Sequence, residues 1–239
     1  MRNLWADERL SIRMISASGR ELLASMGLEL NIAAMETDLI IKEVTGYDRL
    51  HIMLNLDELV EKAKSDRIME LLRLRSTSMP MAYVLGHREF MGLDFYCERG
   101  VLIPRPDTEV LVETVMENLS HGRHIYGIEI GAGTGIISLS LLSHFPELSM
   151  IAGDINEQAI ELARKNARYV DEQNGDIEKY FPVRGRFSVV YSDLFKNIEP
   201  LKLYDSENHE DLYDFIVSNP PYIHTHVIDT LMSDVSDFE

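Results

Sequence analysis

Apolar residues in the first 85 positions recur at helical spacing, three and four positions apart. Two such stripes contain Leu22, Leu23, Met26 and Leu30, and Ile68, Leu71, Leu72 and Leu74. Because one face of a helix returns every 3.6 residues, this pattern predicts amphipathic helices. The first proline is Pro80, and Thr45–Gly46 offers a short turn. We therefore expect an all-helical segment over residues 1–85.

Residues 86–104 differ in character from the helical segment. Their sequence, GHREFMGLDFYCERGVLIP, is rich in aromatic and branched side chains and is interrupted by Gly92 and Gly100. Short apolar runs separated by glycine are typical of a β-hairpin. We expect this hairpin to link the helical segment to the remainder of the chain.

From Pro106 onward, helical patterns alternate with short apolar strands. Strands are predicted at 125–130, 149–154, 187–193 and 214–219, and helices at 107–118, 134–143 and 156–169. This alternation is typical of an α/β domain with a parallel sheet and right-handed crossovers. Ligands of such sheets bind beyond the carboxyl ends of the strands, where the strand order reverses. We therefore assign residues 105–239 to an α/β catalytic domain.

Composition narrows the class of protein further. The chain has 239 residues, 45% of them apolar and 26% charged, as in globular proteins. Cys97 is the single cysteine, which excludes an intramolecular disulfide and a cysteine-based zinc cluster. No run reaches the roughly 18 apolar residues of a membrane helix, and the N-terminus lacks the apolar stretch of a secretory signal. We expect a cytoplasmic protein without a membrane partner or a metal.

The net charge of −17 is concentrated after the helical segment. Residues 1–85 contain 13 acidic and 11 basic groups, whereas residues 86–239 contain 27 and 12. Proteins that bind duplex nucleic acid usually present a basic surface, because neutralising phosphates supplies much of their affinity. Direct sequence-specific binding of nucleic acid is therefore not expected, and a local basic groove is the alternative that stays open.

The sequence EIGAGTG joins a predicted strand to a predicted helix, beginning at Glu129. Its glycines, Gly131, Gly133 and Gly135, let the backbone turn tightly and lie against a ligand. A nicotinamide-dinucleotide fingerprint requires a small residue where this chain has Ile136. The pattern instead resembles the loop with which class I methyltransferases bind S-adenosyl-L-methionine. A purely structural glycine turn is the alternative.

Two aspartates follow the next two predicted strands. Asp154 lies about 20 residues beyond the glycine loop, where a carboxylate can accept both ribose hydroxyls of a nucleoside. The alternative for Asp154 is a helix N-cap, a position that Asn156 can also fill. Asp193 is predicted to accept the adenine amino group, with Leu194 and Phe195 packing on the ring; a simple turn residue is the alternative.

The sequence Asn219-Pro220-Pro221-Tyr222 follows the last predicted strand. It resembles the catalytic motif of methyltransferases that modify planar amide or exocyclic amino nitrogens. Such a nitrogen is a poor nucleophile because its lone pair is delocalised. The Asn219 side-chain oxygen and the Pro220 carbonyl can accept its two N–H bonds and favour the charge it develops. Tyr222 can stack on the planar group; a rigid loop without chemistry is the alternative.

With these motifs, nearly the whole chain resembles the release factor glutamine methyltransferase family. The resemblance includes residues 81–113, MAYVLGHREFMGLDFYCERGVLIPRPDTEVLVE. By position, it implies that Arg105, Pro106, Thr108 and Glu109 frame the cofactor and the substrate. It also implies methyl transfer to the glutamine amide of a Gly-Gly-Gln motif in a peptide chain release factor. The helical domain would then dock that partner.

The end of the sequence adds a further expectation. Tyr222 is followed by 17 residues, and the class I fold normally continues with three more strands. We therefore expect the last strands of the sheet to be missing and the strand at 214–219 to lie at an edge. Residues 205–214 form an acidic segment, interpreted as a solvated loop, and His224 and His226 are weak evidence for a metal.

Two other functions compete with the leading hypothesis. A nucleic-acid amino methyltransferase would share the Asn-Pro-Pro-Tyr motif, because an exocyclic amine presents the same planar geometry. The acidic charge and the missing basic target-recognition segment weigh against it. A truncated, inactive module that only binds the cofactor or the release factor is the second alternative, and it is favoured by the early stop.

Overall fold

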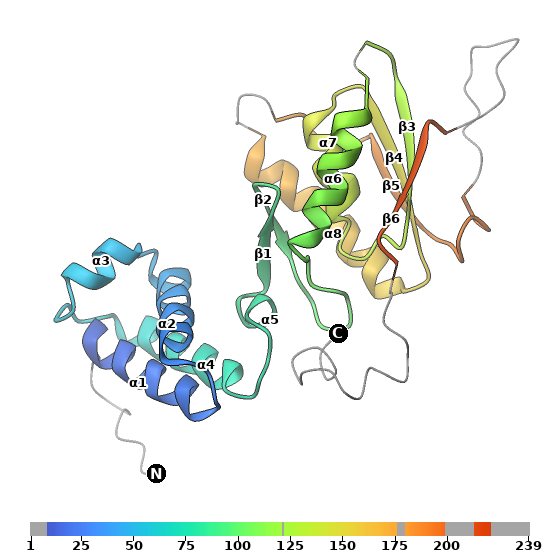
Figure 1. Cartoon of the computed structure of the whole chain (residues 1–239). Coiled ribbons are helices and arrows are strands. Elements are labelled where there is room, and N and C mark those ends of the chain that lie inside the picture. Colours follow the sequence, from blue (N-terminus) through green and yellow to red (C-terminus); the bar gives the residue numbers. More distant parts are fainter. Residues whose placement is uncertain (1–8, 121, 176–179, 199–212, 221–239) are drawn as a thin grey trace, which may run out of the picture. The chain divides into compact units, whose positions relative to one another are not determined.

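The computed structural model describes residues 9–120, 122–175, 180–198 and 213–220 (Figure 1). These residues fall into two compact units, one reaching Leu85 and the other starting at Gly86. None of the helices in these ranges combines the length and the apolar character needed to cross a membrane.

The first unit is helical, as predicted. It contains α1 (Ile12–Ser25), α2 (Leu30–Thr45), α3 (Arg49–Leu54), α4 (Lys62–Arg75) and α5 (Met81–Leu85). Its core is a cluster of fully buried aliphatic side chains that includes Ile12, Ile15, Leu23, Ile40, Ile41, Ile68 and Leu72. Helix α2 ends at the predicted turn, where Gly46 has φ 79° and its N–H bonds the Lys42 carbonyl.

A buried ion pair joins α2 to α4 inside this apolar core. Arg75 Nε lies 2.8 Å from Glu36 Oε2, and a second guanidinium nitrogen lies 3.1 Å from Glu36 Oε1. Both side chains are almost fully buried. The same guanidinium also donates to the Met79 carbonyl beyond α4. The two charges are thus neutralised by a bidentate contact, which fixes the relative position of the helices.

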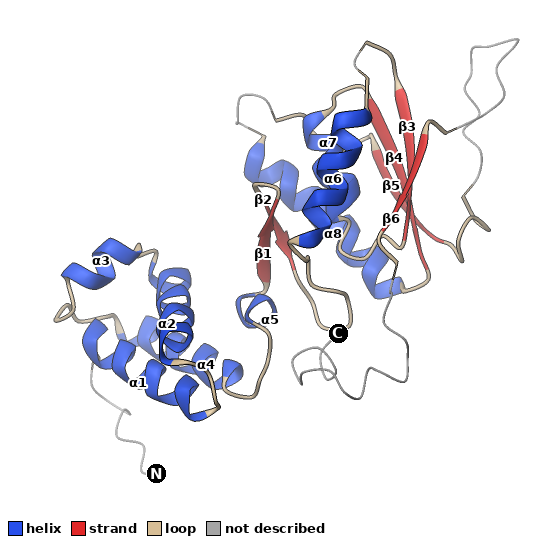
Figure 2. Cartoon of the chain, viewed as in Figure 1, coloured by secondary structure: helices blue, strands red, loops and turns tan. Residues whose placement is uncertain are grey.

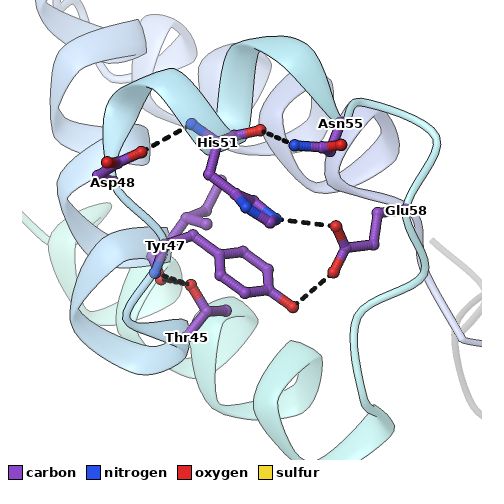
Figure 3. Close-up of polar contacts among 7 residues, drawn as sticks. Thr45, Tyr47, Asp48, His51, Asn55 and Glu58 are labelled. Carbon is purple, nitrogen blue, oxygen red and sulfur yellow. Dashed lines mark hydrogen bonds and ion pairs between the residues drawn. The ribbon is translucent and has the colours of Figure 1, made fainter.

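Polar contacts hold α3 against the loop that follows it (Figure 3). Asp48 caps the helix by accepting from the His51 N–H. The Glu58 carboxylate accepts from the Tyr47 hydroxyl at 2.7 Å and pairs with His51 Nε2 at 2.8 Å. The rings of Tyr47 and His51 stack with their centroids 4.1 Å apart. These contacts lower the pKa of Glu58, because both partners stabilise its ionised form.

The second unit begins with the predicted hairpin, in which β1 (His87–Phe90) pairs antiparallel with β2 (Leu93–Tyr96). It continues with α6 (Asp107–Asn118), β3 (Ile125–Ile130), α7 (Ile136–His144), β4 (Leu148–Asp154), α8 (Glu157–Asn174), β5 (Phe187–Tyr191) and β6 (Phe215–Ser218). The last four strands form a parallel sheet in the order β5-β4-β3-β6. The α/β prediction with a parallel sheet is therefore confirmed.

The strand order reverses between β3 and β6. From β3 the chain moves outward through β4 and β5, then returns so that β6 pairs with the other side of β3. In Figure 2, helices α6, α7 and α8 gather on one side of this sheet. The core between them contains Leu139, Leu142, Met150 and Val217. Among the described strands, β6 lies at one edge, as expected.

Two helix boundaries differ from the sequence prediction by two residues or more. Helix α7 begins at Ile136, two residues later than predicted, because Gly135 has the left-handed φ of 81° and cannot continue a helix. Helix α8 continues to Asn174, five residues beyond the predicted end. Its buried face extends through Val170 and Asn174, so packing sustains the last turns.

Candidate active site

The pairing of β3 with β6 brings the two main motifs together. In the parallel register Ile130 lies beside Ser218, so Gly131 and Asn219 directly follow neighbouring strand ends. The Ser218 hydroxyl donates to the Ile130 carbonyl at 2.7 Å. The glycine loop and the Asn-Pro-Pro-Tyr motif thus start at the same edge of the sheet, at the switch point that the sequence predicts for a ligand.

Three backbone N–H groups of the glycine loop form hydrogen bonds within the protein. The N–H groups of Gly131 and Ala132 donate to the Gly153 carbonyl at 2.8 and 3.1 Å, and the Gly133 N–H donates to Asp154 Oδ2 at 2.9 Å. These three donors are therefore already used. A Cβ placed on Gly131 or Gly133 would meet no described atom within 4 Å. Both glycines have positive φ, 79° and 52°, so the loop presents bare backbone on an open side.

Gly135 serves a different purpose from the other two glycines. A Cβ at this position would lie 3.2 Å from both the Ala163 Cβ and the Leu139 Cδ1. Its missing side chain therefore allows α8 to pack closely against the start of α7. This packing role needs no ligand, and a direct cofactor contact for Gly135 stays a prediction.

Asp154 lies at the end of β4, next to the glycine loop. Besides Gly133, its carboxylate accepts from the Asn156 N–H at 2.9 Å. Asn156 itself caps α8, because its side chain accepts from the Gln158 N–H. The capping role therefore belongs to Asn156. Asp154 is half-buried, and its role as an acceptor for ribose hydroxyls stays a prediction.

Glu129 is buried below the loop, with 1% of its surface exposed. One carboxyl oxygen accepts from the Ser138 N–H at 3.1 Å and from the Ser138 hydroxyl. Burial raises the pKa of Glu129 to about 7, because removing the charge from water outweighs these two hydrogen bonds. The side chain therefore ties the end of β3 to the first turn of α7. Its contact with the cofactor stays a prediction.

Asp193 occupies the turn after β5. Its carboxylate is exposed and forms an ion pair with Lys196 Nζ at 2.5 Å. Leu194 and Phe195, predicted to pack on an adenine ring, are 61% and 49% exposed. These apolar surfaces are accessible in this structure, and the assignment of Asp193 to the adenine amino group stays a prediction.

The start of α6 contacts the Asn-Pro-Pro-Tyr motif. Asn219 Nδ2 donates to the Thr108 hydroxyl oxygen at 3.1 Å, and Thr108 is 5% exposed. Glu109 Oε1 accepts from the Met91 N–H at the tip of the hairpin, and Arg105 is half-buried just before the helix. Of the remaining predicted site residues, Pro220 is exposed.

Pro221 and Tyr222 lie outside the described residues, as do His224 and His226. Asp214, the last residue of the acidic segment, is described. It accepts from Arg123 at 2.6 Å and from the Tyr126 N–H at 2.8 Å. This part of the predicted solvated loop is therefore anchored to the start of β3.

Comparison with known proteins assigns the family. Residues 105–234 match the model described as "Methyltransferase small domain", and residues 16–86 match "PrmC N-terminal domain". The release factor glutamine methyltransferase of Agrobacterium fabrum is 33% identical over 237 residues, covering 98% of this chain and 73% of that protein. The chain belongs to the release factor glutamine methyltransferase family. The resemblance found in the sequence is thereby confirmed.

A second relative has a similar sequence identity to this chain. The Clostridium botulinum enzyme of the same name is 34% identical over 205 residues, which cover 86% of this chain and 66% of that protein. Across the first curated relatives, the chain spans between 48% and 73% of their length. Among solved structures, the N-terminal domain of human METTL16 in complex with SAH aligns with a TM-score of 0.37 and 20% identity, over 94% of this chain and 70% of that one.

Asn166 supports the candidate site but was not among the residues predicted from the sequence. Asn166 is fully buried on α8. Its oxygen accepts from the Tyr96 N–H at 2.8 Å, and its nitrogen donates to the Thr134 carbonyl at 2.9 Å. It therefore connects the hairpin to the glycine loop. A polar residue inside the apolar stripe of α8 is the signal that could have found it.

Proposed function

We propose that this chain transfers a methyl group from S-adenosyl-L-methionine to the side-chain amide nitrogen of a glutamine. The proposed substrate is the Gly-Gly-Gln motif of a peptide chain release factor. Family membership supports this reaction. The observation that carries it is the register of β3 and β6, because it sets Asn219 beside the start of the glycine loop at Gly131.

The residues at this edge fit the proposed cofactor. S-adenosyl-L-methionine contains no phosphate, and three backbone donors of the glycine loop are bonded within the protein rather than free to bind an anion. The open side of Gly131 and Gly133 can accommodate a ligand against the backbone. The Asp154 carboxylate, half-buried beside that loop, retains lone pairs that can accept the two ribose hydroxyls.

The chain's own residues would bind and orient the amide. When bound, S-adenosyl-L-methionine supplies a methyl group on a positively charged sulfur. Asn219 Oδ1 and the Pro220 carbonyl would each accept one N–H of the glutamine amide. These two acceptors favour the positive charge that develops on nitrogen, and they fix its direction of attack. The nitrogen loses a proton after it is methylated, so no strong base is needed. Tyr222 would stack on the planar amide.

The partner and the location follow from the same proposal. A release factor is the protein substrate, and the helical N-terminal unit is its docking module. Release factors act in translation termination, so the chain would work in the cytoplasm. The net charge of −17 disfavours direct binding to nucleic acid as its main mode of recognition.

A methylation assay tests the proposal. The chain is incubated with radiolabelled cofactor and either a release factor or its Gly-Gly-Ala variant. We expect label in the first protein and none in the second. The variant Asn219→Ala should bind the cofactor with nearly unchanged affinity and transfer methyl at least about 100-fold more slowly. Label on the Gly-Gly-Ala protein, or preferential label on nucleic acid, would contradict the proposed substrate.

A further inference from the structure

The Asn219 side chain can direct either its amide nitrogen or its amide oxygen toward a substrate, and only the oxygen can accept a hydrogen bond from it. Its amide carries a nitrogen that donates and an oxygen that accepts. A substrate amide nitrogen needs acceptors for its own N–H groups. Rotation of the Asn219 amide by 180° would exchange the two atoms and direct a donor toward the substrate. Methyl transfer therefore requires that the amide be held with its oxygen toward the substrate.

A contact from α6 holds the amide in this orientation in the structure. Asn219 Nδ2 donates to the Thr108 hydroxyl oxygen at 3.1 Å. Because nitrogen and oxygen diverge from one trigonal carbon, the nitrogen faces Thr108 and Oδ1 is directed away from it. In the described part of the chain, Asn219 Oδ1 receives no hydrogen bond. It is therefore left available to accept from a substrate.

Thr108 is itself held in place by its surroundings. It is 5% exposed in the first turn of α6, and its N–H bonds the Arg105 carbonyl. The next residue, Glu109, accepts from the Met91 N–H and so ties this turn to the hairpin. On the other side, Ser218 bonds the Ile130 carbonyl and fixes the backbone just before Asn219. Both partners of the contact thus belong to anchored segments.

The geometry points to Thr108 as a positioning residue that orients the Asn219 amide for methyl transfer. This inference rests on the proposed function, and it is separate from the cofactor contact that the family resemblance implies for Thr108, which stays a prediction. It also assigns a purpose to the Arg-Pro-Asp-Thr-Glu segment: the segment delivers a hydroxyl acceptor to the motif 111 residues later in the chain. The Thr108 side chain itself need not touch the cofactor or the substrate.

Conservative variants separate this role from cofactor binding and from simple structural support. Thr108→Val keeps the shape and removes the acceptor, whereas Thr108→Ser keeps the hydroxyl. We expect Thr108→Val to lower kcat about tenfold, the loss of roughly one hydrogen bond, with cofactor affinity unchanged. Thr108→Ser should restore most of the rate. Thr114→Val makes the same chemical change at an exposed position of α6 and serves as the control.

A double-mutant cycle tests whether Thr108 acts through Asn219. If it does, Thr108→Val combined with Asn219→Ala should be no slower than Asn219→Ala alone. A further tenfold loss in the double variant would overturn the inference. So would a wild-type rate in Thr108→Val, or a weakened cofactor affinity that accounts for its slower rate.

Nuclear magnetic resonance of the Asn219 side-chain amide tests the contact without any substrate. The resonance is assigned by its absence in Asn219→Ala. Thr108→Val should shift one of its two protons upfield and speed its exchange, while Thr108→Ser should not. If the wild type fails to methylate a release factor, the proposed function fails, but this readout still decides the contact. An Asn219 resonance that is identical in wild type and Thr108→Val overturns the inference.

Discussion

Replacing Glu129 with glutamine should make the second unit more stable at neutral pH relative to wild type. Glu129 is buried and bonded through one oxygen to Ser138. Glutamine has nearly the same shape and keeps a carbonyl oxygen for these bonds, but it cannot ionise. The substitution therefore measures the free-energy cost of burying an ionisable group below the glycine loop.

The size of this effect follows from the raised pKa of Glu129. The pKa rises from 4.5 to about 7 in the folded chain, chiefly because burial disfavours the charged form. The folded state thus binds the proton more tightly than the unfolded state. The stabilisation that this proton gives the folded state is fully present below pH 4.5 and is lost as the pH rises through 7. At 1.36 kcal/mol per pKa unit, the loss amounts to about 3 kcal/mol.

Comparison of the two proteins at two pH values measures this loss. Between about pH 5.5 and about pH 8, the free energy of unfolding of Glu129→Gln minus that of wild type should rise by about 2 kcal/mol. Hydrogen exchange of peptides from β3 and β4, corrected for its intrinsic pH dependence, reports on this unit. Glu113→Gln, on the exposed surface of α6, controls for the change in net charge. A difference that stays constant with pH would refute the reasoning.

Three further substitutions test other contacts. Glu36→Gln leaves the Arg75 charge buried, so the first unit should lose about 3–5 kcal/mol of stability, measured by urea unfolding. Gly127→Ala places a methyl group against the Phe215 ring and should lower the melting temperature of the second unit, at a cost of about 1–3 kcal/mol. Asp154→Ala should weaken binding of S-adenosyl-L-methionine by about 1.5–3 kcal/mol, and unchanged affinity by calorimetry would contradict the ribose assignment.

Local patterns were enough to predict most elements of the fold. The helix at 107–118 and the strand at 125–130 have the bounds that the sequence predicts. Both are bounded by clear signals, since Pro106 precedes the helix and the glycine loop follows the strand. The end of α8 was predicted less well, because its last turns depend on the buried contacts of Val170 and Asn174 rather than on local propensity.

The residue types along the chain were enough to identify its family. Short motifs such as the glycine loop and Asn-Pro-Pro-Tyr keep their residue types and order whatever the surroundings, so they can be read without a structure. From them came the family resemblance and the candidate residues Asp154 and Asn219, whose individual roles stay predictions. The α/β fold came instead from the alternation of strand and helix patterns.

Which atoms come into contact depends on how the elements pack. The Thr108–Asn219 hydrogen bond and the Glu36–Arg75 pair join residues 111 and 39 positions apart. No local pattern encodes such contacts, because they depend on strand order and helix packing. The same holds for the raised pKa of Glu129, which exists only because folding removes its carboxyl from water.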